Sequence, residues 1–375
     1  MSHFTVLVIG QDPERQLAPY HEFECTGVVD EFVQSIDLTA EKREDYESDT
    51  RNMVKVPAGV VVPDGTRDLV SHPAHGTLVS RYASMFYVET GEKDPLGGAR
   101  RTFQLPEGYE EIEVPVRELM TFLEYVTEDS ESEPIGENVK PDLEGAQKWG
   151  WVRVDAAGEV LEVIDRTNPN KKWDWHVLGG RWTGFFKMKP HVRGIQGRPG
   201  LMTSPAKEGY ADSAFKMDID FEGMRAEAEA KAAEKFDAIR AIIEPHLPVQ
   251  SWAEVRGQYW REDGAEPELP GGIEAAREAY REQPAVKALR ECEKYTWENA
   301  EDYAGDRATY IRHQGIRSSM TFAVVKDGKW YERGSMGWWG CVSDEKDQGA
   351  WIEEFGKLVE GLPDDTLLSV YDCHI

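Results

Sequence analysis

Short apolar runs at both ends of the chain predict buried strands. The run Phe4–Ile9 reads Phe-Thr-Val-Leu-Val-Ile and stops at Gly10, and Leu367–Ile375 closes the chain. β-Branched residues at this density favour a strand. We expect these two terminal strands to be neighbours in one sheet.

Hairpins are predicted where two such segments flank a turn sequence. Trp149–Asp165 carries Trp-Val-Arg-Val and Val-Leu-Glu-Val-Ile on either side of Asp-Ala-Ala-Gly. Ser319–Val325 and Lys329–Glu332 flank Asp327-Gly328 in the same way. One further strand is expected at Met53–Val62.

Helices are predicted mainly in the middle of the chain. The strongest is Phe221–Ile243, which is rich in Ala, Glu, Lys and Arg and is stopped by Pro245. A second helical stretch, from Gly272 to about Trp297, should break near Pro284. The other expected helices are Thr39–Ser48 with Thr39 as its cap, Val114–Val126, and amphipathic Asp347–Val359.

This order of elements predicts an α+β fold, with a mixed or antiparallel sheet and a central helical block. The chain is long enough for two domains or one large one. We expect an α+β region at 1–215, a helical region at 216–315 and a β-β-α-β region at 316–375 that packs back on the first, unless all three form one compact domain. The acidic, Pro/Gly-punctuated segment Thr127–Asp142 is the expected mobile loop.

The net charge of the chain limits the classes of molecule that it is expected to bind. The 375 residues include 70 acidic and 43 basic side chains, a formal charge of −27. That field repels phosphate backbones and argues against nucleic acid as a partner. It is compatible with a binder of small molecules or basic proteins, or with an acidic DNA mimic. The last is disfavoured because the acids are spread along the chain between Trp- and Gly-rich segments.

Nothing in the sequence indicates export or a membrane. The four cysteines form no CxxC pair, and no N-terminal run has the layout of a signal peptide. No apolar run approaches the span of about twenty residues that crosses a bilayer. We therefore expect a cytoplasmic protein with reduced thiols and no membrane partner.

The most informative segment is Lys171–Phe186, where three tryptophans, a histidine and an arginine surround a Gly-Gly step. On an extended strand Trp173 and Trp175 share one face, and Asp174 and His176 share the other. Aromatic walls beside an obligate cation suit a planar anionic ligand such as a nucleotide. The alternative is an aromatic hairpin packed into a core. The expected ligand-binding residues in this segment are Trp173, Trp175, His176, Arg181 and Trp182.

Two further segments extend this predicted pocket. The Gly- and Pro-rich loop Pro190–Gly209 carries Arg193 and Arg198 and could form an anion-binding rim or lid. Trp338 and Trp339 stand in a second aromatic, Gly-rich cluster that could form the opposite wall. The alternative for that cluster is a loop that folds its own tryptophans into the core.

Metal and cofactor motifs are not found. His21 with Cys25, and Asp372 with His374, offer ligand types at spacings that match no standard zinc signature, and His72 and His75 are better explained as a loop. The sequence has no GxxxxGK(S/T), HExxH or GxSxG, and no GxGxxG at the start of a helix that follows a strand. We expect no bound metal and no cofactor.

Two stretches carry a resemblance. The opening Met-Ser-His-Phe-Thr-Val-Leu-Val-Ile-Gly, continuing through Leu-Ala-Pro-Tyr-His-Glu-Phe-Glu-Cys-Thr-Gly, and the segment Trp-Asp-Trp-His-Val-Leu-Gly-Gly-Arg-Trp resemble a family of tailed-bacteriophage proteins usually left as hypothetical. The resemblance implies expression in the cytoplasm of an infected bacterium. Phage accessory proteins of this kind often counter host defence, some by sequestering or cleaving nucleotide immune signals. The resemblance supplies no catalytic residues.

Three functions follow as hypotheses. The first is a counter-defence protein that binds and sequesters a small nucleotide-like signal through the Trp/Arg pocket, with or without forming a homo-oligomer. The second is a hydrolase or lyase that cleaves such a nucleotide, with His176 or His21 as general acid or base and Asp174, Glu24 or Asp372 nearby. The third is an acidic inhibitor whose partner is a host defence protein such as a nuclease or restriction enzyme.

Overall fold

A computed structural model describes residues 2–63, 66, 69–93, 98–128, 133–261, 265–336 and 341–375. The chain forms two compact units, each of which is described here by itself. Unit 1 comprises Met1–Glu22 and Asn170–Ile375, and unit 2 comprises Phe23–Pro169. This division differs from the three successive regions expected from the sequence. In unit 1 the N-terminal strand pairs with strands from the second half of the chain. Residues 23–169 contact mainly one another and form unit 2.

Unit 1 is built on a seven-stranded sheet around the C-terminal strand β21 (Leu367–His374). The N-terminal strand β1 (His3–Ile9) pairs antiparallel with β21 from His3↔His374 to Ile9↔Leu368, which confirms the expected neighbours. The sheet is mixed, because β1 pairs parallel with its other neighbour, β17. The remaining strands are β12 (Trp175–Gly180), β14 (Arg198–Pro199), β16 (Ser213–Phe215), β17 (Ala323–Lys326) and β18 (Lys329–Glu332).

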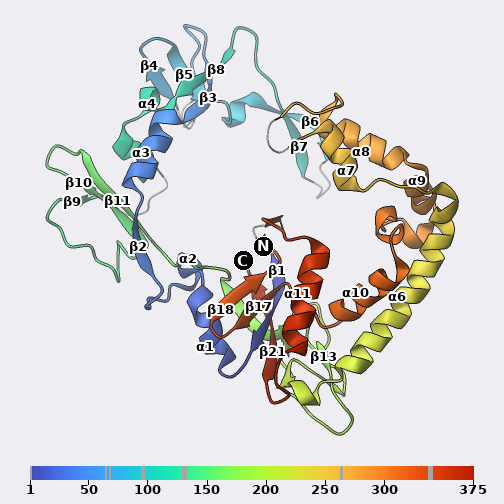
Figure 1. Cartoon of the computed structure of the whole chain (residues 1–375). Coiled ribbons are helices and arrows are strands. Elements are labelled where there is room, and N and C mark those ends of the chain that lie inside the picture. Colours follow the sequence, from blue (N-terminus) through green and yellow to red (C-terminus); the bar gives the residue numbers. More distant parts are fainter. Residues whose placement is uncertain are drawn as a thin grey trace. The chain divides into compact units, whose positions relative to one another are not determined.

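Alternation along the central strands divides the apolar residues between two cores. Leu7 on β1 belongs to the core that holds Trp351 and Phe355 of α11 (Gln348–Glu360). Val6 and Val8 of β1 face the other way, into a core that includes Leu17 of α1 (Pro13–Leu17). Figure 1 shows α11 beside these central strands. Both faces of the sheet are therefore partly covered.

The helical block of unit 1 is organised by the long helix α6 (Phe221–Ile243), whose predicted bounds are confirmed. Phe236 and Ile239 of α6 pack with Val286 and Leu289 in a separate core. The predicted break at Pro284 is confirmed, since Gln283 is extended just before the proline. The other helices are α7 (Trp252–Tyr259), α8 (Gly272–Glu282), α9 (Pro284–Arg290) and α10 (Arg307–Arg317).

Short strand pairs complete unit 1. β13 (Phe186–Lys187) pairs with β15 (Tyr210–Ala211), and β19 (Ser335–Met336) pairs with β20 (Val342–Ser343).

Unit 2 consists of small sheets with short helices. The predicted hairpin Trp149–Asp165 is confirmed as β10 (Gly150–Val154) and β11 (Val160–Thr167), with the carboxylate of Asp155 accepting two turn N–H groups. The other strands are β2 (Gln34–Asp37), β3 (Thr50–Lys55), β4 (Val70–His72), β5 (Gly76–Ser80), β6 (Tyr87–Lys93), β7 (Ala99–Phe103), β8 (Glu110–Pro115) and β9 (Ile135–Gly136). The helices are α2 (Phe23–Thr26), α3 (Thr39–Ser48), α4 (Val116–Leu119) and α5 (Phe122–Thr127).

Several local predictions in unit 2 need correction. The expected helix Val114–Val126 is split, because Thr121 forms a capping box that starts α5 afresh. Helix α3 has the predicted bounds, but Thr39 is not its cap; the carboxylate of Asp37 accepts the N–H of Thr39. The centre of the expected mobile loop, residues 129–132, lies outside the described residues.

The predicted α+β fold with a mixed sheet and a helical block is confirmed. In the described part of the chain, no helix combines the length and apolar character needed to cross a membrane.

Candidate functional site

The register of unit 1's central strands gathers polar residues at one end of the sheet. His374 of β21 lies opposite His3 of β1 on one side and opposite Trp175 of β12 on the other. Asp372 lies two residues before His374 on the same face of β21, because side chains alternate along a strand. We call His3, Asp174, Trp175, Asp372 and His374 the paired-histidine site.

Each histidine of this site is held by its own carboxylate. Nδ1 of His3 lies 2.8 Å from Oδ1 of Asp372, and Nδ1 of His374 lies 2.7 Å from Oδ1 of Asp174. The two imidazole rings lie edge to face with their centroids 4.8 Å apart. Asp372 is 1% exposed and His374 is 5% exposed. The two His–Asp pairs thus adjoin each other in a largely buried setting.

This arrangement suits proton transfer. A carboxylate that accepts a hydrogen bond from Nδ1–H fixes the ring orientation and the tautomer, and it leaves Nε2 as the nitrogen that can exchange a proton. Two such imidazoles side by side provide a group to remove a proton and a group to supply one.

Trp175 forms the exposed edge of the site. Its ring stacks on that of His374, with centroids 5.1 Å apart and an interplanar angle of 15°, and it meets His3 edge to face. Trp175 is 41% exposed. A partly exposed indole face beside the two imidazoles can support a planar ring of a bound molecule.

The Gly-Gly step at the end of β12 is required by two buried carboxylates. Gly179 and Gly180 have φ of +82° and +55°. A Cβ added at Gly180 would lie 2.3 Å from Cβ of Asp372, and one at Gly179 would lie 2.7 Å from Oδ2 of Asp212. The step turns the N–H of Arg181 onto Oδ2 of Asp372 at 2.9 Å. Glycine here allows the chain to wrap around the carboxylate that orients His3.

Trp173 and His176 lie together on the other face of the sheet. The sequence predicts that Trp173 shares a face with Trp175 and that Asp174 shares one with His176; both pairings are wrong. Strand β12 begins only at Trp175. Trp173 precedes it and is 8% exposed, in the core that includes Leu17, whose carbonyl oxygen accepts the indole N–H. Its ring contacts that of His176 at 4.5 Å.

His176 occupies a half-buried polar position outside the paired-histidine site. Its Nε2 lies 3.4 Å from Oε2 of Glu14, and its ring contacts that of Tyr371. Burial lowers the pKa of His176, and the nearby Glu14 carboxylate opposes that shift. His21, the other predicted acid or base, lies against Trp173 with ring centroids 6.2 Å apart. His176 thus faces Glu14, whereas the carboxylates of Asp174 and Asp372 hold His374 and His3.

Exposed arginines follow the Gly-Gly step. Arg181 comes directly after it, and Arg198 on β14 pairs with Gly179 in register. The side chains of Arg181, Arg193 and Arg198 are exposed and form no ion pair within the described residues. Three lysines near the tryptophans have partners within the protein. Lys172 forms an ion pair with Glu332, and Lys187 forms ion pairs with Glu227 and Asp220. Lys189 donates a hydrogen bond to the carbonyl of Met217.

The other three tryptophans predicted to bind a ligand are not found in the paired-histidine site as described. Trp182 is partly buried, and its backbone N–H donates to the carbonyl of Gly179 in the turn at the end of β12. Trp338 and Trp339 lie outside the described residues.

His3 is the residue of this site that sequence reasoning missed. It stands in the quoted opening segment, but no motif marks it as functional. The available signal was the pairing of the terminal strands. Had the His3↔His374 register been written out, it would have placed the two histidines opposite each other.

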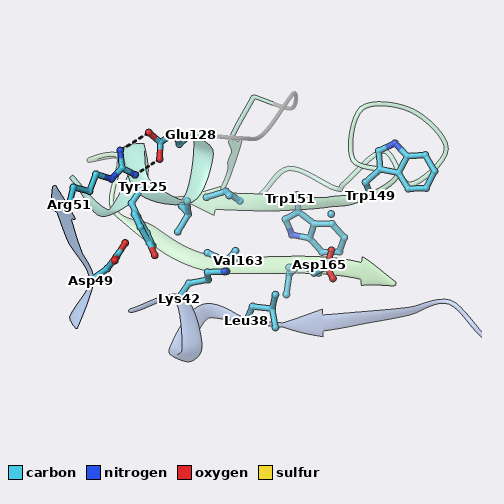
Figure 2. A pocket seen from close by; sticks show the side chains of 14 residues that line it. Leu38, Lys42, Asp49, Arg51, Tyr125, Glu128, Trp149, Trp151, Val163 and Asp165 are labelled. Atoms are coloured by element: carbon cyan, nitrogen blue, oxygen red, sulfur yellow. Dashed lines mark hydrogen bonds and ion pairs between the residues drawn. The ribbon is translucent and has the colours of Figure 1, made fainter. Parts of the chain in front are cut away.

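Unit 2 contains a separate cavity of about 670 Å³ between α3, α5 and the β10–β11 hairpin. Figure 2 shows the Arg51–Glu128 ion pair at one end and Trp149 and Trp151 at the other. Two basic residues, Lys42 and Arg51, face three acidic ones, Asp49, Glu128 and Asp165. Since the acids outnumber the bases, this cavity offers an anionic ligand no net attraction.

Comparison with family models, with curated proteins and with solved structures gave no match.

Proposed function

We propose that unit 1 is an acid–base catalyst that cleaves a phosphate ester in a small nucleotide-like molecule. The observation that carries this proposal is the pair of adjoining imidazoles, each oriented by its own carboxylate. A protein that only holds a ligand has no need for two oriented proton-transfer groups. For this reason we place catalysis ahead of simple sequestration, which the tryptophan pattern alone favoured.

The reaction would use the two histidines in complementary roles. One neutral imidazole accepts at Nε2 the proton of the attacking hydroxyl, from water or from the substrate, as the new P–O bond forms. The other, protonated, donates its Nε2 proton to the leaving oxygen as the old P–O bond breaks. Asp174 and Asp372 would stabilise the positive charge on the imidazoles and fix their orientation.

The surroundings favour an anionic, ring-bearing substrate. Arg181 and Arg198 are exposed cations on the segments around the Gly-Gly step, and the backbone of Arg181 bonds to Asp372. Guanidinium groups bind phosphate oxygens in a forked geometry. The exposed face of Trp175 suits a base. The resemblance to tailed-phage proteins supplies a setting: removal of a nucleotide signal used by the infected host.

The alternative is sequestration of the same ligand without cleavage. The observation that favours it is Trp175, whose partly exposed indole stacks on His374 and would hold a planar ring whether or not the ligand is cleaved. The two functions share the ligand class and differ in whether the ligand is recovered intact.

The decisive experiment incubates the pure protein with a panel of cyclic and linear nucleotides, denatures it and identifies the released compounds by mass spectrometry. We expect a new product, and we expect His3→Ala and His374→Ala each to abolish it while the exposed control His246→Ala does not. Intact recovery of a bound nucleotide would support sequestration. Absence of both product and bound nucleotide would contradict the proposal.

A further inference from the structure

A shallow hollow in the helical block of unit 1 gathers basic and aromatic side chains. It measures about 260 Å³ and is lined by Trp252 of α7, Arg277, Tyr280 and Arg281 of α8, and Arg290 of α9. Figure 1 shows these three helices in sequence along the block. Three guanidinium groups line one hollow in a chain whose net charge is −27.

Two of these arginines form no ion pair within the described residues. They are Arg281 and Arg290, whereas Arg277 pairs with Glu274 at 2.5 Å. Arg281 and Arg290 each lie in the last turn of their helix, where a cation interacts favourably with the helix dipole. That accounts for each residue alone but not for their convergence on one hollow. Like charges brought together in this way are stabilised when an anion lies between them.

The carboxylate of Glu301, which holds the aromatic wall of the hollow, forms no ion pair with either arginine within the described residues. Oε2 of Glu301 accepts the hydroxyl of Tyr280 at 2.5 Å, and Oε1 accepts the backbone N–H of Trp252 at 3.1 Å. Both oxygens are thus used by uncharged donors, and they fix the two aromatic residues of the hollow. The rings of Trp252 and Tyr280 lie edge to face, with centroids 5.7 Å apart.

We propose that this hollow is a second ligand site, which binds a small molecule carrying a phosphate on a planar ring system, as in a nucleoside monophosphate. Arg281 and Arg290 bind the phosphate, and Trp252 and Tyr280 contact the ring. The fork of a guanidinium matches phosphate oxygens, and indole and phenol rings are the usual partners of a base. The site shares no residue with the paired-histidine site and does not depend on its proposed chemistry.

The test is isothermal titration calorimetry of the whole protein with AMP, adenosine and inorganic phosphate. We expect AMP to bind, and adenosine and phosphate each to bind at least about tenfold more weakly, because each lacks half of the contacts. Arg281→Gln and Arg290→Gln should each weaken AMP binding by about tenfold or more, as expected for loss of a charge-assisted hydrogen bond. Arg290→Lys, which keeps the charge but not the fork, should fall between.

Two control variants test whether AMP binds in this hollow rather than elsewhere on the protein. Lys287→Gln removes one positive charge from the same turn of α9 outside the hollow, and it should leave AMP affinity within about twofold. In a His374→Ala background, Arg290→Gln should weaken AMP binding by the same factor as in the unaltered protein, because the two sites share no residue. Failure of AMP to bind, an equal loss in Lys287→Gln, or disappearance of the Arg290→Gln effect in the His374→Ala background would each overturn the proposal. Melting curves identify any arginine variant that fails to fold, and Arg290→Lys then carries the test.

Discussion

The imidazoles of His3 and His374 lie with their centroids 4.8 Å apart, although the two residues stand at opposite ends of the chain. The antiparallel pairing of β1 with β21 sets them opposite each other. Their carboxylate partners come from two places: Asp372 lies on β21 itself, and Asp174 lies just before β12. Three segments distant in sequence therefore have to assemble before the site exists.

Asp174→Asn tests whether the carboxylates orient the histidines. An amide in place of the carboxylate can present N–H to Nδ1, which favours the wrong tautomer of His374 and stabilises its protonated form less. We expect turnover of the substrate found in the nucleotide panel to fall about 100-fold or more, with a changed pH–rate profile and a cooperative melt. The exposed Asp364→Asn serves as the control. Unchanged turnover in Asp174→Asn would show that Asp174 has no part in catalysis.

Trp173 and Trp175 should respond oppositely to truncation. Trp173 is 8% exposed and its N–H is bonded to Leu17, whereas Trp175 is 41% exposed. Trp173→Ala should lower the free energy of unfolding by about 3–5 kcal/mol, the usual cost of deleting a core aromatic side chain. Trp175→Ala should cost about 1 kcal/mol and weaken substrate binding instead. Chemical denaturation measures both, and equal losses of stability would contradict the placement of these residues.

The sequence was sufficient for the fold wherever local pattern decides structure. The bounds of α6, the break at Pro284 and the β10–β11 hairpin follow from composition, proline and turn chemistry. Local patterns could not predict the division into two units. The pairing of β1 with β21 places the N-terminal residues in the same unit as the C-terminal ones, so Phe23–Pro169 forms a unit of its own.

The site was predicted only in part. The Trp-rich segment, Asp372 and His374 were all singled out, but they were assigned to different groups. The assumption that an extended strand begins at Trp173 placed Asp174 with His176, whereas the structure pairs Asp174 with His374. One residue of error in a strand boundary exchanges the two faces. His3 was missed because a lone histidine carries no signal until its partner strand is known.

Gly180 should be intolerant of any side chain. Its φ is +55°, and an added Cβ would lie 2.3 Å from Cβ of Asp372. Gly180→Ala should therefore cost more than the strain of about 1–2 kcal/mol that alanine bears in the left-handed region. Gly328→Ala is the matched control, since Gly328 has φ of +69° with no atom within 4 Å of its added Cβ. If both variants lose the same stability, the close approach of Asp372 is not what requires glycine.

We predict that the purified protein carries no stoichiometric zinc and that chelators leave its activity unchanged. The His and Cys spacings match no standard zinc signature, and the Nδ1 atoms of His3 and His374 are bonded to carboxylates. A zinc site takes three or four protein ligands. Elemental analysis and activity after dialysis against EDTA check this. If about one equivalent of a transition metal is found and is lost in His374→Ala, the prediction is wrong and a metal-assisted reaction is favoured over proton transfer by the two histidines.

The pH dependence of stability should reveal His176. Burial lowers its pKa below the ordinary histidine value of 6.5, against the opposing effect of Glu14. The unfolded chain then binds a proton at pH values where the folded protein does not, so protonation favours unfolding. The contribution of neutral His176 to the free energy of unfolding is fully present above about pH 6.5. It is lost as the pH falls towards and through the lower pKa of the folded protein.

We therefore expect the free energy of unfolding to fall between about pH 7 and 5, and His176→Phe to reduce the slope. Phenylalanine keeps the ring contacts with Trp173 and Tyr371 and cannot take up a proton. Glu14→Gln should steepen the loss, because it removes the carboxylate that favours the charged imidazole. The exposed His246→Gln is the control and should follow the unaltered protein. Denaturant titrations at several pH values measure all four, and a slope unchanged by His176→Phe would place the titrating group elsewhere.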